Sequence, residues 1–290
     1  MKLMNHKNCR LFTEAGALSQ LSAYYEEERN IIWMMLHGYP RPCFNLELLM
    51  EIKALKVAVK KSGLKVDFWV TGSTVPNLYN VGGDLSFFAR SIRDGQRDAL
   101  RSYAHACIDA VHSAMTGFDC DAVTIAMVEG TAMGGGYEAA LAHDYVLAQK
   151  DAKMGFPEIA FNLFPGMGAY SLVARKANRA VAEELISSGE AHSGEWHHQV
   201  GLVDLVFDQD MAFNTTRTFI DSLRPKLNGI KAMLRTRRKV FPLEFSELID
   251  ITNDWTESAF TLEEKDLAYM ERLVILQNRR VGKLPELVAA

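Results

Sequence analysis

Short apolar runs alternate with helical stretches over most of the chain, and this alternation limits the possible folds more than any other feature. The apolar runs of strand length are residues 31–36, 66–70, 124–128 and 145–148. Between the first two runs, apolar residues recur at helical spacing after Asn45, a residue type that caps helices, until Gly63. Residues 97–115 also follow a helical pattern. Strands that alternate with helices predict an α/β domain.

The pattern changes toward the C-terminus. From residue 214 to residue 280 it is helical, with few strand signals. We therefore expect an α/β core with an N-terminal extension over residues 1–210, and a helical region over residues 211–290. No flexible linker separates the two parts, so the helical region is expected to pack on the core or on a neighbouring subunit.

Composition argues against several classes of protein. The 290 residues are 48% hydrophobic and 23% charged, which suits a folded domain. The formal net charge of −4 gives no support for nucleic-acid binding. We find neither a signal-peptide pattern nor an apolar run of the roughly 18 residues that a membrane span needs. A cytoplasmic protein without a membrane span is therefore expected.

Cysteine and histidine spacing predicts no metal site. The four cysteines lie far apart without a CxxC pair, which indicates reduced thiols. His197 and His198 are adjacent rather than four residues apart on a helix, so they are poorly placed to share a metal ion.

Two glycine-rich segments precede expected helix starts. Residues 80–85 read NVGGDL and overlap residues 74–84, whose proline, asparagines and glycines predict a loop. Residues 130–138 read GTAMGGGYE and lie between a strand and a helix, but they form neither a P-loop nor a dinucleotide fingerprint. Glycine lets a ligand approach the backbone, and a helix N-terminus presents free N–H groups. The first segment is more often a structural turn, whereas for the second both tight packing and function stay open.

A carboxylate and a third glycine turn follow. Residues 155–158 read GFPE and residues 163–168 read LFPGMG. A single glutamate in a loop is usually only solvated. Together, however, the three segments resemble the crotonase (enoyl-CoA hydratase/isomerase) superfamily, whose pattern is a GGD or GAD turn, then GxAxGGGxE, then PE and a PGxG turn. The resemblance covers residues 30–210, including GLVD at 201–204. It implies an α/β fold with a ββα spiral core and a helical C-terminal region.

The resemblance also implies roles for four residues. The backbone N–H groups of Gly83 and Gly135 would form an oxyanion hole for the thioester oxygen, where one donor can contribute roughly 3–4 kcal/mol. Many family members have alanine in place of Gly83, a change that should keep the N–H. Glu138 and Glu158 would be the acid–base pair, because dehydration needs a base for the α-proton and an acid for the leaving hydroxyl. Two carboxylates in one partly apolar pocket favour different protonation states.

The chain is also similar to a narrower branch of the superfamily, the diffusible signal factor synthases. The similarity lies in residues 81–88, 156–171 and 270–280, and the phrase FPGMGAYS is its most distinctive part. This branch implies an enzyme that dehydrates a 3-hydroxyacyl group on acyl carrier protein to the cis-2-enoyl thioester. It then hydrolyses the thioester to a free cis-2-unsaturated fatty acid, a quorum-sensing signal. The resemblance implies no cofactor or metal, and a homotrimer or dimer of trimers.

An acyl chain needs an apolar pocket. The matching segments offer Met167, Trp255 and Leu273, with ordinary core packing as the alternative for each. Basic residues gather at 235–239 and 279–283, where an acidic acyl carrier protein could dock, unless these are only solvated helix faces.

Two other functions stay open. One is a catabolic enoyl-CoA hydratase, which would act on a coenzyme A thioester with the same catalytic residues. The other is a regulator that binds a sensor kinase and uses the fold only as a scaffold. The presence of both Glu138 and Glu158 argues against the regulator as the sole role.

Overall fold

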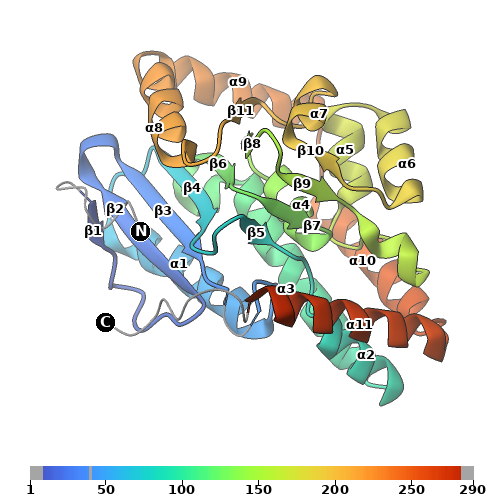
Figure 1. Cartoon of the computed structure of the whole chain (residues 1–290). Coiled ribbons are helices and arrows are strands. Elements are labelled where there is room, and N and C mark those ends of the chain that lie inside the picture. Colours follow the sequence, from blue (N-terminus) through green and yellow to red (C-terminus); the bar gives the residue numbers. More distant parts are fainter. Residues whose placement is uncertain (1–8, 39–40, 282–290) are drawn as a thin grey trace.

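Two β-sheets organise the chain, which the computed structural model describes over residues 9–38 and 41–281, with side chains as far as residue 278 (Figure 1). The strands of the larger sheet, in spatial order, are β1 (Cys9–Leu11), β2 (Leu21–Glu26), β3 (Ile31–Leu36), β4 (Phe68–Ser73), β6 (Val123–Val128), β8 (Tyr145–Gln149) and β11 (Leu205–Phe207). Neighbours from β3 to β11 run parallel, and β1 and β2 add an antiparallel edge.

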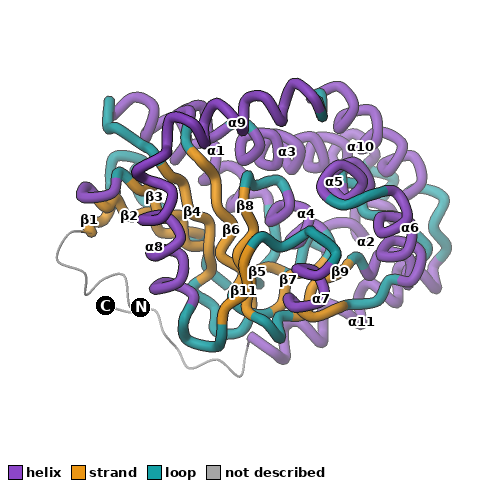
Figure 2. Tube along the Cα trace, turned by 90° about the horizontal axis from the view of Figure 1, so that it is seen from above, coloured by secondary structure: helices purple, strands orange, loops and turns teal. Residues whose placement is uncertain are grey.

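Three of the four strands of the smaller sheet directly follow β4, β6 and β8 along the chain. Its strands, in spatial order, are β10 (His192–Ser193), β9 (Lys153–Gly155), β7 (Thr131–Met133) and β5 (Leu78–Asn80). Along the chain, the consecutive strands β4 and β5, β6 and β7, and β8 and β9 form three pairs, each with one strand in the larger sheet and one in the smaller. Each pair is followed by one or more helices (Figure 2). These are α2 (Leu85–Arg93) and α3 (Arg97–Met115), α4 (Gly135–Leu141), and η4 (Pro157–Phe161) with α5 (Ala169–Lys176). This repeat confirms the expected ββα core.

Both faces of the larger sheet are buried, which explains why residues 31–36 are apolar throughout. Successive side chains of a strand point to opposite faces. Every second residue from Ile32 packs in the main core, whereas every second residue from Ile31 packs in a second core. That second core is covered by α8 (Ala212–Leu223) and α9 (Leu227–Val240). A strand with two covered faces has no reason to alternate apolar and polar residues.

The first two expected helices are confirmed. The first of them, α1, spans Leu46–Ser62. The side-chain oxygen of Asn45 accepts the Leu48 N–H at 2.8 Å, and Gly63 ends the helix with a φ of 69°. Residues 97–115 form α3. The cap and stop residues therefore placed α1 correctly, whereas α3, whose N-cap Gln96 makes no side-chain cap hydrogen bond, was predicted from its periodic pattern alone.

Two expectations were wrong in detail. The strand expected at residues 66–70 begins later, because β4 takes its register from β3, with Ile31 opposite Phe68 and Leu36 opposite Ser73. The loop expected at residues 74–84 contains β5. A three-residue strand is too short to give a periodic signal.

The C-terminal part is helical, as expected. Beyond α8 and α9 it contains η5 (Arg224–Lys226), α10 (Phe245–Ala259) and α11 (Glu264–Val281). The remaining helical segments are η2 (Glu27–Arg29), η3 (Gly117–Asp121), α6 (Arg179–Ser188) and α7 (Gly194–Gln199). α10 packs along α3 and α11 along α2, so both helices lie on the core of the same chain. Within the described residues, no helix combines the length and hydrophobicity needed to cross a membrane.

Candidate active site

A cavity of about 250 Å³ lies where the segments after β5 and β7 meet η4 and the helices α2, α3, α10 and α11. All seven residues singled out from the sequence line it: Gly83, Gly135, Glu138, Glu158, Met167, Trp255 and Leu273. They come from widely separated parts of the chain. The structure therefore places the suggested acid–base pair, the suggested oxyanion amides and the suggested acyl-binding residues around one space.

The two glycine turns at the suggested oxyanion hole lie against each other. A Cβ on Gly135 would be 3.5 Å from the backbone nitrogen of Gly83, and a Cβ on Gly82 would be 3.0 Å from the nitrogen of Gly135. In the part of the chain that the structure describes, neither the Gly83 nor the Gly135 N–H donates a hydrogen bond to protein. Both amides are therefore free to bind a ligand oxygen in the cavity.

The glycine triplet is required for close packing as well. It follows β7 and opens α4, the expected strand–turn–helix. Gly134 has a φ of +51°, and a Cβ there would lie 2.2 Å from Oε1 of Glu158. A Cβ on Gly136 would lie 2.4 Å from the carbonyl oxygen of Asn80. Close packing therefore requires glycine at these positions, and the functional role of the triplet stays a prediction.

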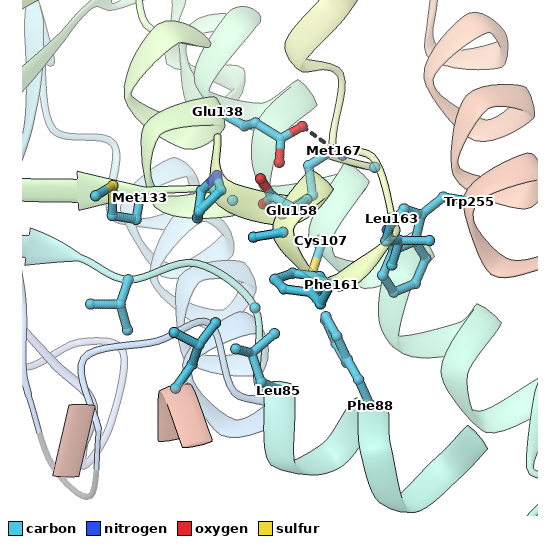
Figure 3. Close-up of a pocket in the computed structure, with 18 of the residues that line it drawn as sticks. Leu85, Phe88, Cys107, Met133, Glu138, Glu158, Phe161, Leu163, Met167 and Trp255 are labelled. Carbon is cyan, nitrogen blue, oxygen red and sulfur yellow. Dashed lines mark hydrogen bonds between the residues drawn. The ribbon is translucent and has the colours of Figure 1, made fainter. Parts of the chain in front are cut away.

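Glu138 is buried and held in one orientation. Its Oε1 accepts the backbone N–H of Met167 at 2.7 Å (Figure 3) and that of Ala169 at 2.9 Å. Met167 lies in the glycine turn before α5, and Ala169 is the first residue of that helix. Burial raises the pKa of Glu138 to about 7, although these two donors pull it down. One oxygen of Glu138 is thus fixed by the backbone while the carboxyl group titrates near neutrality.

Glu158 faces Glu138 across the cavity (Figure 3). The residue is half-buried, but its Oε2 is enclosed and has no hydrogen-bond partner among the described residues. Burial, and then the charge of Glu138, raise the pKa of Glu158 well above its ordinary value. Because two such groups titrate as a pair, the arrangement favours one proton on Glu158 and a negative charge on Glu138.

The rest of the cavity is mostly apolar. The ring of Phe88 packs edge-on against Trp255, with ring centroids 5.1 Å apart at 69°. Among the described lining residues, Glu138 and Glu158 are the only charged ones. Sequence reasoning missed Phe88, Phe161 and Tyr103 as lining residues. The helical pattern of residues 97–115 indicated a buried face for Tyr103, but not that this face borders a cavity.

Two arginines of the basic cluster at residues 235–239 have a structural role, whereas Arg235 and Lys239 are exposed, so docking there stays a prediction. Arg237 and Arg238 contact one oxygen of the buried Asp144 at 2.8 and 3.0 Å. They therefore tie α9 to the core. In Figure 1, α9 lies at the opposite side of the molecule from α11, which lines the cavity. For the second cluster, the side chains of Arg279 and Arg280 and the whole of Lys283 lie outside the described residues.

The fold and the paired carboxylates define a crotonase-type protein. Residues 26–259 match the family model described as enoyl-CoA hydratase/isomerase, and the chain belongs to this family. Residues with metal-binding side chains do not gather in groups of three or more within the described part of the chain.

Relatives and solved structures agree with this assignment. The mitochondrial methylglutaconyl-CoA hydratase of Rattus norvegicus is 32% identical over 186 residues, which cover 64% of this chain and 56% of that protein. The 2,3-dehydroadipyl-CoA hydratase of Escherichia coli K12 is 27% identical over 186 residues, covering 64% of this chain and 68% of that protein. The match therefore spans little more than half of the rat protein.

Two solved structures show the same fold. An enoyl-CoA hydratase/isomerase from Xanthobacter autotrophicus Py2 superposes with a TM-score of 0.74 at 21% identity, covering 93% of this chain and all (100%) of that one. Pseudomonas aeruginosa DspI superposes with a TM-score of 0.62 at 20% identity, covering 89% and 95%.

Proposed function

We propose that the chain is an acyl-thioester dehydratase that uses Glu138 and Glu158 as its acid–base pair. One observation carries the proposal: two buried carboxyl groups with different hydrogen bonding face each other across an apolar cavity, beside two free backbone amides. Acid–base catalysis at neutral pH needs groups whose pKa values lie far from those of exposed carboxylates.

The mechanism follows from these positions. The thioester oxygen accepts hydrogen bonds from the N–H groups of Gly83 and Gly135, which stabilise the charge that builds there. Glu138, as the ionised member, removes the α-proton of a 3-hydroxyacyl thioester. Glu158, as the protonated member, gives its proton to the departing hydroxyl. The carbon–oxygen bond breaks, a carbon–carbon double bond forms, and water leaves.

We further propose that the chain is a diffusible signal factor synthase. In this reaction the 3-hydroxyacyl group arrives on acyl carrier protein, and the cis-2-enoyl thioester is hydrolysed to the free acid. Support comes from residues 156–171, which resemble that branch. The same segment supplies Phe161 and Met167 to the cavity wall and the Met167 N–H to Glu138. The cytoplasmic location and the homotrimer or dimer of trimers stay predictions.

A catabolic enoyl-CoA hydratase is an equally direct alternative. The curated relatives are named as hydratases of coenzyme A thioesters, and this reaction would use the same residues. The acyl groups in those two names are dicarboxylic, however. Among the described lining residues, no lysine, arginine or histidine is present to bind a second carboxylate. An uncharged fatty acyl chain therefore suits this cavity better than the dicarboxylic groups. A sole role as a regulator of a sensor kinase would leave the buried acid pair without a use.

Product analysis separates these functions. Purified protein would be given a 3-hydroxyacyl-acyl carrier protein and, separately, the matching coenzyme A thioester, with Glu158→Gln as the control. Mass spectrometry would detect enoyl thioester and free acid. Free cis-2-enoic acid from the carrier protein, absent with the control, supports the synthase. Enoyl-CoA without free acid supports the catabolic hydratase, and no product from either thioester would contradict both.

A further inference from the structure

We propose that Gly83 and Phe88 form a matched pair that sets the acyl specificity of the cavity. The missing Cβ of residue 83 admits the Phe88 ring, and the ring takes the space that a branch next to the thioester would need. The proposal rests on the proposed binding of an acyl thioester at the Gly83 amide. It adds to it the class of acyl group that is accepted.

The Phe88 ring lies where an alanine side chain at residue 83 would be. A Cβ built on Gly83 would lie 2.4 Å from Cζ of Phe88 and 2.9 Å from its Cε2. The φ of Gly83 is not in the left-handed region, unlike that of Gly82, which is +93°. The backbone at residue 83 would therefore accept alanine, and only the ring excludes it. The expectation that alanine would keep the N–H at residue 83 stays a prediction, but in this chain the new methyl group would meet the Phe88 ring.

The Phe88 ring is held between two neighbouring aromatic rings. Phe88 lies in the first half of α2, whose N-terminus is capped by the Asp84 side chain. Its ring packs edge-on against Tyr103 at 5.4 Å and Trp255 at 5.1 Å. Trp255 in turn fills the Cβ position of Gly166, with its Cγ 2.4 Å away. A change of side-chain rotamer would cost a ring packed in this way its contacts, so the Phe88 ring forms a fixed part of the cavity wall.

The wall stands beside the first carbons of a bound acyl chain. A thioester oxygen on the Gly83 N–H places the carbonyl carbon next to residue 83, and both Gly83 and Phe88 line the cavity. A methyl branch on the second carbon would compete with the ring, whereas a straight chain would pass along it. A hydrophobic pocket distinguishes one methyl group by roughly 10–200-fold in kcat/KM. We therefore expect a preference for straight chains.

The first test compares a straight trans-2-enoyl-CoA with its 2-methyl isomer of equal carbon number, using the rate of hydration. Phe88→Ala should raise the ratio of branched to straight kcat/KM by about tenfold or more. Phe87→Ala is the matched control, because Phe87 packs on Tyr103 at 5.2 Å but does not line the cavity. Its ratio should stay that of the parent. An unchanged ratio in Phe88→Ala would overturn the proposal.

The second test measures the pairing itself. Gly83→Ala should lower the melting temperature by a few degrees, because the new methyl group overpacks against the ring. Adding Phe88→Ala should remove most of that loss, which is a non-additive result. Additive losses would contradict the pairing.

If the parent hydrates neither enoyl-CoA, the catabolic hydratase alternative fails, and the dehydratase proposal is judged with the carrier-protein thioester as described above. The specificity proposal is then judged from calorimetric binding of the two saturated acyl-CoAs to the parent and to Phe88→Ala. Tighter binding of the straight chain by the parent, lost in the variant, supports it. Equal binding by the parent overturns it.

Discussion

Glu138 makes the stability of the protein depend on pH in a definite direction. Burial raises its pKa from the ordinary 4.5 to about 7. The folded protein therefore holds this proton more tightly than the unfolded chain, and the free energy of unfolding falls as pH rises between these values. Glu138→Gln has no charge to bury. We expect its melting temperature to exceed that of the parent at about pH 8, and this advantage to be absent near pH 4.5. Thermal unfolding at both pH values would measure this, and a gap independent of pH would contradict it.

The two glutamates should separate the two chemical steps. Thioester hydrolysis needs the oxyanion hole and one base to activate water, whereas dehydration needs both a base and an acid. We expect at least one of Glu138→Ala and Glu158→Ala to retain part of the hydrolysis of a preformed 2-enoyl thioester. The release of free thiol would measure it. Loss of hydrolysis to the background rate in both variants, while both remain folded, would contradict this division.

At the scale of residues, the sequence motifs identified the candidate acid–base pair but not the residues that contact it. Glu138 and Glu158 follow from GxAxGGGxE and PE. The donors to Glu138 from Met167 and Ala169 do not, because 29 and 31 residues separate the partners. Phe88 was missed as a lining residue for a related reason. The spacing of α2 shows that the helix has a buried face, but not that a cavity lies beneath it.

At the scale of elements, Asp144 makes α9 part of the core. Its carboxylate is buried and is contacted by Arg237, Arg238 and the backbone N–H of Thr124. Replacing both arginines by glutamate would leave the buried Asp144 carboxylate without these positively charged partners. We expect Arg237→Glu with Arg238→Glu to destabilise the fold by up to about 3 kcal/mol, since the arginines are partly exposed. Turnover of carrier-protein and coenzyme A thioesters should then fall together.

Lys239→Glu is the control for this double variant, because Lys239 is exposed on the same helix. Denaturant unfolding would give the loss of stability, and its midpoint for the control should be that of the parent. A double variant that keeps the parent's stability but loses only turnover of the carrier-protein substrate would contradict this expectation and support docking at residues 235–239.

Elements with a cap or a long periodic run were predictable, and three-residue strands were not. α1 has a cap and a stop residue, and α3 has a long periodic run, whereas β5 exists because it pairs with β7, which in turn pairs with β9. The shift of β4 has the same cause, since its ends are set by β3 and β6. Strand pairing is a tertiary interaction, and a local sequence pattern does not predict which strands pair or where they begin.

At the scale of the whole molecule, the cavity is assembled from residues between Val81 and Gln277. Family resemblance predicted the ββα core and grouped the seven site residues. The closing of the cavity by α10 and α11 depends on how these helices pack on α3 and α2. The apolar face of each helix indicated that the helix is buried on one side, but it did not show which part of the protein packs against that face.

The central claim is that Glu138 and Glu158 act together on an acyl thioester, and dehydration rates test it most directly. Single-turnover conversion of a 3-hydroxyacyl thioester to the 2-enoyl thioester would be followed by mass spectrometry for the parent, Glu138→Gln and Glu158→Gln. Glutamine keeps the volume of the side chain but cannot transfer the proton. We predict that each variant slows the step by roughly 10²–10⁴-fold while remaining folded. A folded glutamine variant that dehydrates at the parent rate would contradict the account.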